Sequence, residues 1–329
     1  MSHAVVSRRG LIQASLLGAG ALGVMPFGRA LARTTDTVRL TWGPGGLTLV
    51  AKQRGVFEKR LAQQGIKVEW VGPFPNHAPS MQAVAGGSAD FSFGGSTTPA
   101  LAALIAGAPL VFVEFFEYTP RTTAIIARDQ SGINSIKDLV GKSVAVNRSG
   151  LGEFLLVAAL EKNGVDRSKV RFVYLNPPDA APAFAAGRVD AWAMWSPGVD
   201  ISREQTQAHD LFLEGRDLDF QIDYTSYLTT RDFAAGNPDL VRAVIDGLKA
   251  EGEWAYQNPF EAETIAQHEG KYSDALRDHF ASLRRQYTFY APGDAGFVAQ
   301  LQRAADWLTA HKVLPEPITI ADHLASLPA

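Results

Sequence analysis

The chain repeats one segment about a hundred residues apart. Residues 83–93 read AVAGGSADFSF and residues 183–193 read AFAAGRVDAWA. In each copy a glycine (Gly87, Gly187) can end a helix in the left-handed conformation, and an aspartate (Asp90, Asp190) and a strand-like run follow. The flanking order also matches: strand, glycine-bearing turn, helix, strand, helix, strand. The repeat therefore predicts two similar α/β halves.

Hydrophobic periodicity places further elements and divides the chain. Strands are expected at 38–42, 67–71, 110–116 and 143–146, and helices at 47–57, 79–85, 100–106, 153–162, 238–256, 259–268, 274–286 and 293–311. The chain would cross between halves near 117–120 and return near 222–229. We predict one lobe from 33–117 plus 225–329, a second from 118–224, and a hinge with a cleft between them.

The first 32 residues have the pattern of an export signal. Ser7-Arg8-Arg9-Gly10-Leu11 is a twin-arginine pattern, an apolar stretch runs to Phe27, and Ala30-Leu31-Ala32 supplies the small residues of a cleavage site. We predict a twin-arginine signal peptide cleaved after Ala32; the alternative is an uncleaved anchor. Cleavage removes three arginines and no acid, which changes the formal charge from −3 to −6.

Composition excludes several kinds of chemistry. The 329 residues include no cysteine, so disulfides, thiolate nucleophiles, cysteine-ligated metals and lipid-anchored cysteines are impossible. No Lys/Arg run suits nucleic acid, and no nucleophile elbow, Walker loop or metalloprotease motif occurs. The histidines lack metal-ligand spacing. We expect no catalytic residue, no metal and no cofactor.

Three strand-to-helix junctions and one strand end predict a ligand site. In open α/β sheets, ligands bind beyond the carboxyl ends of strands and against helix N-termini, where an anion is favoured. Glycines would let the backbone approach the ligand, Thr98 would be an N-cap, hydroxyls and a guanidinium would donate hydrogen bonds, and tryptophans would form walls. The candidates are Trp42, Gly45, Gly46, Gly95, Ser96, Thr97, Thr98, Arg148, Ser149, Gly150, Trp195 and Ser196.

Each candidate also has a plain structural interpretation. The Gly95–Thr98 run could be only a capped helix start, and Arg148 could be a solvated loop residue. Trp192 fits a core position better than Trp195, which ends its strand. His77 lies in a turn before a helix and is more often a surface residue there than a cleft residue.

These residues lie within stretches that resemble a known family. The chain looks like a periplasmic substrate-binding protein of an ABC importer, in the aliphatic sulfonate, taurine and nitrate group. The similarity runs from about Val38 to Ile320, and its clearest stretches are AKQRGVFE (51–58), VEW (68–70), ADFSFGGSTTP (89–99), IKDLVGKSVAV (136–146) and VDAWAMW (189–195). The resemblance implies a type II venus-flytrap fold that closes on a small organic anion, with an aliphatic sulfonate as the leading ligand. It implies delivery to an ABC permease in the inner membrane, without catalysis, by a monomer free in the periplasm.

The chain departs from the family at the expected pocket. Sulfonate binders resemble Gly-Ser-Ser-Ala-His where this chain has residues 149–153 (SGLGE), and Trp-Asp-Pro-Tyr where it has 195–198 (WSPG). Glu114 and Glu117 would add acid at the crossing, as hinge ion pairs or as contacts to a ligand amine. Some similar proteins are enzymes, including a cysteine-dependent desulfinase and a pyrimidine-precursor synthase. The alternative is therefore an enzyme or sensor of this fold acting on a pyrimidine-like or nitrate-like ligand.

Overall fold

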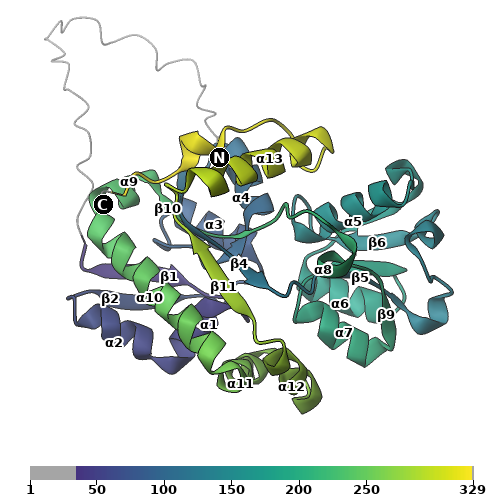
Figure 1. The fold of residues 1–329 in the computed structure, drawn as a ribbon, viewed down its shortest axis with the longest axis horizontal. Helices are drawn as coiled ribbons and strands as arrows, with labels where there is room; N and C mark the ends of the chain where they lie inside the picture. The colour runs from purple at the N-terminus through teal and green to yellow at the C-terminus, as the bar shows by residue number, and fades with distance from the viewer. Residues whose placement is uncertain (1–34, 328–329) are drawn as a thin grey trace, which may run out of the picture. The chain divides into compact units, whose positions relative to one another are not determined.

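The structure, a computed structural model, describes residues 35–327, and its strands lie in two sheets (Figure 1). The first sheet begins with the parallel pair β1 (Thr37–Thr41) and β2 (Lys67–Val71). Phe91 connects this pair to the other strands of the sheet, because its backbone pairs with a residue of β1 on one side and with a residue of β10 (Thr225–Thr230) on the other. The remaining strands are antiparallel neighbours in the order β11 (Gln286–Tyr290), β4 (Leu110–Thr119), β10 (Thr225–Thr230), β3 (Gly95–Ser96).

The second sheet uses only strands from the middle of the chain. Its order is β7 (Arg171–Tyr174), β6 (Ser143–Val146), β8 (Ala191–Met194), β5 (Ala124–Arg128), β9 (Ala208–Leu213). The first three are parallel, and β5 runs antiparallel to both of its neighbours. Strands β6 and β8 are buried along their whole length, as expected for short apolar strands covered on both faces.

The repeated segments fold alike, one in each sheet. The Asp90 carboxylate accepts a hydrogen bond from the backbone N–H of Arg39 at 2.7 Å, and the Asp190 carboxylate accepts one from Ser143 at the same distance. Each aspartate returns its own N–H to the carbonyl of that residue, at 2.8 and 2.9 Å. The two repeated glycines have φ of +76° and +70°. The predicted internal repeat is therefore confirmed in three dimensions.

Helices cover both sheets (Figure 1). Those from the outer parts of the chain are α1 (Leu47–Arg54), α2 (Val56–Ala62), α3 (His77–Ala85), α4 (Thr97–Ile105), α9 (Arg231–Gly236), α10 (Pro238–Gln257), α11 (Pro259–Gly270), α12 (Asp274–Ser282) and α13 (Ala295–Ala310). Those from the middle are α5 (Leu151–Lys162), α6 (Pro177–Ala185), α7 (Gly198–Thr206) and α8 (Glu214–Asp217). Short 3₁₀ turns occupy Asp129–Ser131, Ile136–Leu139, Arg167–Lys169 and Ile320–His323.

Two helix predictions are wrong in part. The helix expected over 47–57 breaks at Gly55, whose φ of +64° is left-handed and separates α1 from α2. The helix expected over 274–286 ends at Ser282, and β11 follows. Strand β11 forms because its backbone pairs with β4, starting with Gln286 opposite Thr119.

Helix α5 is apolar all round because it is buried on two sides. Its residues 151–160 are all buried. Leu155 and Leu156 belong to the core of the second sheet. Leu151 and Phe154 belong instead to a core that also contains residues of α13, α4 and β4. The start of α5, which the sequence assigns to the ligand site, is therefore fixed by packing on both sides.

A membrane-crossing helix is not found within residues 35–327, since none there is both long and apolar enough.

Candidate functional site

The β1–α1 turn has open backbone and no side-chain cap. Gly46, the N-cap residue of α1, has φ of +78°, and no side chain caps the first turn of the helix. A Cβ added at Gly45 or Gly46 would meet no heavy atom within 4 Å. The backbone of these two glycines therefore borders open space that a ligand can approach.

Lys52 lies over Trp42 beside this turn. Its Nζ is 4.4 Å from the ring centroid of Trp42, which is itself buried. No ion pair involves Lys52 among the residues that the structure describes. This cation is not among the residues predicted for the site. Lys52 lies in the last turn of α1, and the lean of helical side chains toward the helix N-terminus brings its ammonium group back over Trp42.

The turn before α4 binds an internal carboxylate. One oxygen of Asp223, Oδ1, accepts hydrogen bonds from Ser96 Oγ at 2.6 Å, Thr97 Oγ1 at 3.3 Å, Thr98 Oγ1 at 2.8 Å and the Thr98 backbone N–H at 3.0 Å. Each hydroxyl has a single proton, so these donors are already used. Asp223 thus occupies the position at α4 that the sequence analysis assigned to a ligand anion.

Three expectations for this turn need correction. Thr97 and Thr98 are fully buried, so they do not face a ligand, whereas Ser96 is partly exposed. The N-cap of α4 is Ser96 and not Thr98. The backbone at Gly95 is approached by the ring of His77, which a Cβ at Gly95 would overlap.

His77 is neither a surface residue nor a cleft residue. It is buried, with Nδ1 3.0 Å from the carbonyl of Ser96 and Nε2 3.2 Å from Ser92 Oγ. Burial lowers the pKa of His77 to about 4, because the charged imidazolium would lose its hydration. The ring is therefore a neutral part of the support beneath Ser96.

The loop before α5 is held by its own polar side chains. Asn147 Oδ1 accepts the backbone N–H of Gly152 at 3.0 Å, and a Cβ at Gly150 would overlap the Asn147 amide. Ser149 adopts the left-handed region at φ +45°, and its N–H donates to Glu153 Oε2 at 2.7 Å. Arg148, the residue before Ser149, is exposed.

Glu153 is a buried carboxylate with several partners. Its Oε1 accepts from Arg167 Nη2 at 2.8 Å and from the Tyr174 hydroxyl at 2.7 Å. Its other oxygen caps the Ser149 N–H. The charge of Glu153 is therefore compensated within the second sheet's own residues.

Arg148 projects from this loop as an exposed cation. Its guanidinium carbon lies 3.6 Å from the ring centroid of Tyr174, so the guanidinium stacks on the ring. Within residues 35–327 the Arg148 side chain has no recorded hydrogen bond or ion pair. Its N–H groups remain available to an anion, which distinguishes it from Arg167, paired with Glu153.

The end of β8 supplies the other second-sheet candidates. Trp195 is half-buried against two cores, and Trp192 is buried as the core interpretation predicts. A Cβ at Gly152 would overlap the carbonyl oxygen of Ala193, so the start of α5 lies directly beside this strand end. Ser196, next in the chain, accepts a hydrogen bond from Arg285 Nη2 at 2.9 Å.

The candidates therefore form one group at each sheet. In the first sheet, Phe93 lies between the turn before α1 and the turn before α4. A Cβ at Gly43 would lie 3.3 Å from the ring of Phe93, and the ring centroids of Phe93 and His77 are 5.7 Å apart. In the second sheet, the loop before α5 adjoins the end of β8. Three hydrogen bonds join residues near the first group to residues near the second. They are Asn76 to Asn176 at 3.1 Å, Ser149 Oγ to the Val313 carbonyl at 3.2 Å, and Arg285 to Ser196.

Known proteins resemble the chain over almost its whole length. A protein of Escherichia coli strain K12 named "Putative aliphatic sulfonates-binding protein" is 28% identical over 96% of both chains. The crystal structure of the periplasmic aliphatic sulphonate binding protein SsuA from Escherichia coli matches with a TM-score of 0.76 and 25% identity, covering 90% of this chain and 94% of the other.

A second solved structure agrees. The alkanesulfonate-binding protein SsuA from Xanthomonas axonopodis pv. citri, bound to MOPS, matches with a TM-score of 0.80 and 26% identity, covering 89% of this chain and 99% of the other. The predicted two-lobed α/β fold of periplasmic binding proteins is thereby confirmed. A family model described as NMT1/THI5 like matches residues 46–262, and the chain belongs to that family.

Proposed function

We propose that the protein captures a small organic anion, with an aliphatic sulfonate as the leading candidate, and delivers it to an ABC permease. The relatives whose names describe sulfonate binding support this ligand class. The observation that carries the proposal is Arg148: an exposed guanidinium, oriented by Tyr174 and without a carboxylate partner in the described residues.

The anion would lie between Arg148 and the uncapped first turn of α1. Free N–H groups at a helix start contribute about 0.3–1 kcal/mol each to anion binding, and a charge-assisted hydrogen bond about 1.5–3 kcal/mol. Lys52 adds a second cation, over the ring of Trp42. Gly150 and Ser196 complete the proposed contacts, and Trp42 and Trp195 would form apolar walls. The Ser96 and Ser149 hydroxyls already donate within the protein, to Asp223 and to the Val313 carbonyl, so they are not donors to the ligand.

The proposal includes the organisation and location of the protein. We propose residues 33–117 plus 225–329 as one lobe, 118–224 as the other, and closure of the lobes on the ligand. The predicted signal peptide, residues 1–32, lies outside the described residues. Twin-arginine export, cleavage after Ala32, a periplasmic location and a monomeric state belong to the same proposal.

We also propose that the protein only binds its ligand. Solved structures of the desulfurization enzyme DSZB share the fold at 18% identity, and one of them is a cysteine-to-serine mutant in complex with biphenyl-2-sulfinic acid. This chain contains no cysteine. Incubation of the purified protein with a bound ligand, followed by mass spectrometry, should recover the ligand unchanged; a product formed over several turnovers would contradict the proposal.

A thermal-shift panel tests the ligand class. Alkanesulfonates, taurine, nitrate, sulfate esters and pyrimidines would be added to the purified protein. A ligand present at 100 times its Kd stabilises the folded state by about 2.7 kcal/mol, so the sulfonates should raise the melting temperature. A rise with another class, and none with any sulfonate, would overturn the ligand assignment.

Loss of Arg148 should weaken binding strongly. Arg148→Ala removes a charge-assisted hydrogen bond and should raise the Kd for a bound alkanesulfonate about 10- to 100-fold. Trp195→Ala removes an apolar wall and should raise it about 10-fold. Isothermal titration calorimetry measures both. Arg188→Ala, at an exposed arginine in the turn before β8, is the matched control. Unchanged Kd in both site variants would refute the site.

A further inference from the structure

Arg285 connects a strand of the first sheet to a candidate ligand residue of the second. It directly precedes β11, which pairs with β4 in the first sheet. Its Nη2 donates to Ser196 Oγ at 2.9 Å, and Ser196 follows β8 in the second sheet. Its Nη1 lies 3.3 Å from Glu263 Oε1. No sequence motif indicated this contact.

The guanidinium is largely buried and has unused donor capacity. The side chain of Arg285 is 15% exposed, and its Nε–H is buried without a hydrogen-bond partner in the described part of the chain. The rings of Phe280 and Tyr118 lie 5.1 and 5.9 Å from the guanidinium carbon. A buried arginine with one long contact to a carboxylate is costly unless its donors serve another purpose.

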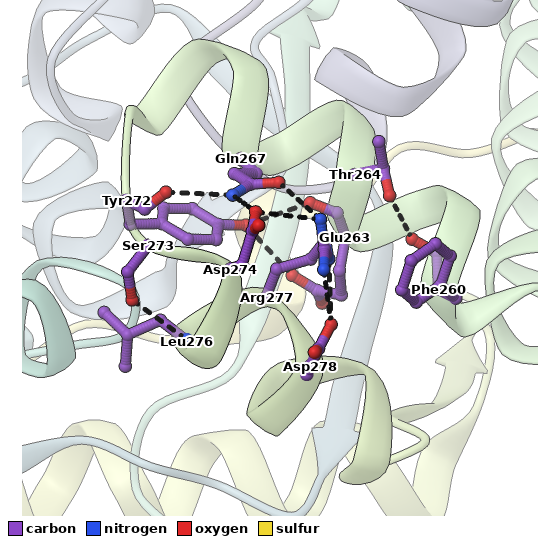
Figure 2. A network of polar contacts seen from close by, with 10 residues as sticks. All are labelled: Phe260, Glu263, Thr264, Gln267, Tyr272, Ser273, Asp274, Leu276, Arg277 and Asp278. Atoms are coloured by element: carbon purple, nitrogen blue, oxygen red, sulfur yellow. Dashed lines mark hydrogen bonds and ion pairs between the residues drawn. The ribbon is translucent and has the colours of Figure 1, made fainter.

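Figure 2 shows the polar network of α11 and α12, which includes Glu263, the carboxylate partner of Arg285. Glu263 also accepts a hydrogen bond from the Tyr272 hydroxyl at 3.3 Å. Gln267 links the pair, because its amide donates to the Tyr272 carbonyl at 3.0 Å and to Asp274 at 2.9 Å. The position of the guanidinium is therefore set by a network that does not itself include Ser196.

The direction of the Ser196–Arg285 hydrogen bond determines what Ser196 can do. An arginine only donates, so Ser196 Oγ is the acceptor and its single hydroxyl proton must point elsewhere. A hydroxyl that accepts from a cation is polarised and becomes a stronger donor. Ser196 follows β8, and the carbonyl of Ala193 in that strand adjoins the start of α5 at Gly152, so the hydroxyl proton is available to an oxygen of an anion bound at this strand end.

We propose that Arg285 is a positioning residue of the ligand site, which orients the Ser196 hydroxyl as a hydrogen-bond donor to the ligand's anionic group. The inference rests on the proposed function. Since the two residues belong to different sheets, the donor is oriented only while the two sheets' segments are in contact. Arg285 thereby links ligand recognition to closure.

A double-mutant cycle on the affinity for pentanesulfonate tests this role. Arg285→Gln and Ser196→Ala should each raise the Kd about tenfold, and the double variant should equal either single variant within about twofold. A residue that only supports the fold would add its own effect to that of Ser196→Ala. Arg285→Lys, which retains a cationic donor, should recover part of the affinity.

Arg188→Gln is the matched control. Arg188 is an exposed arginine in the turn before β8, outside the polar network of α11 and α12, and within residues 35–327 its side chain has no recorded contact with Ser196 or Arg285. It should leave the Kd unchanged. Circular dichroism establishes that each variant is folded; if Arg285→Gln is not, the cycle is run with Arg285→Lys.

The outcomes separate the inference from the function on which it rests. If the wild type binds and the double variant raises the Kd about a hundredfold, the two effects are additive. That result overturns the positioning role and leaves the proposed function standing. Unchanged affinity in Arg285→Gln does the same. Failure of the wild type to bind any alkanesulfonate overturns the proposed function, and the inference with it.

Discussion

Replacing Phe154 with alanine should lower the free energy of unfolding by about 3–5 kcal/mol. The side chain is completely buried on α5 and meets Trp307 of α13 edge-on, with ring centroids 5.7 Å apart. Truncation removes this contact and leaves a cavity between two elements that only tertiary packing joins. Urea denaturation measures the loss as a lower midpoint at an unchanged m value.

An exposed apolar residue provides the control for this variant. Val140 is 49% exposed, and Val140→Ala should change the free energy of unfolding by no more than about 0.5 kcal/mol. A cost below about 1 kcal/mol for Phe154→Ala would contradict the description of α5 and α13 as parts of one continuous core.

Two buried groups should give the folding stability opposite dependences on pH. Burial raises the pKa of Glu114 to about 7, against an ordinary value of 4.5, despite Lys249 at 3.1 Å. Between these values the folded state holds a proton that the unfolded state releases, so stability falls as pH rises. Glu114→Gln removes this loss, and its stability relative to the wild type should rise by about 3 kcal/mol from pH 4.5 to 7.

His77 should act in the other direction. Its pKa is lowered to about 4 by burial, so the unfolded state binds a proton below pH 6.5 that the folded state excludes. The stability that His77 contributes is present above pH 6.5 and is lost as pH falls to 4. His77→Gln should therefore gain about 3 kcal/mol relative to the wild type over that descent, on top of a constant packing cost.

Chemical denaturation at several pH values measures both slopes as differences from the wild type. Tyr227→Phe is the matched control, because Tyr227 faces Glu114 across β10 and β4 and its substitution introduces no group that titrates in this range. Parallel pH profiles for the wild type and Glu114→Gln would contradict the desolvation of Glu114, and parallel profiles for His77→Gln would contradict that of His77.

Local sequence patterns predicted much of the fold. The strands at 67–71 and 143–146 have the predicted bounds, and the two repeated aspartates make equivalent hydrogen bonds. Prediction failed where non-local pairing decides the structure. Residues 286–290 form a strand only because β4, about 170 residues earlier in the sequence, offers an edge.

The candidate site was predicted less completely, for the same reason. The glycine turn before α1 and the exposed Arg148 follow from local patterns. Asp223 lies more than 120 residues from the hydroxyls that it binds, so nothing near Ser96 indicated that they already have an acceptor. Arg285 is likewise far from Ser196 in the sequence, and only the folded chain brings them together.

Calorimetric titration of the wild-type protein with pentanesulfonate tests the central claim most directly. We expect one site per chain and a Kd in the micromolar range or tighter, which corresponds to about −8 kcal/mol or more negative. The Arg148→Ala variant should bind at least about tenfold more weakly in the same titration. No heat and no binding for the wild type, or equal affinity for the two proteins, would contradict a sulfonate site built around Arg148.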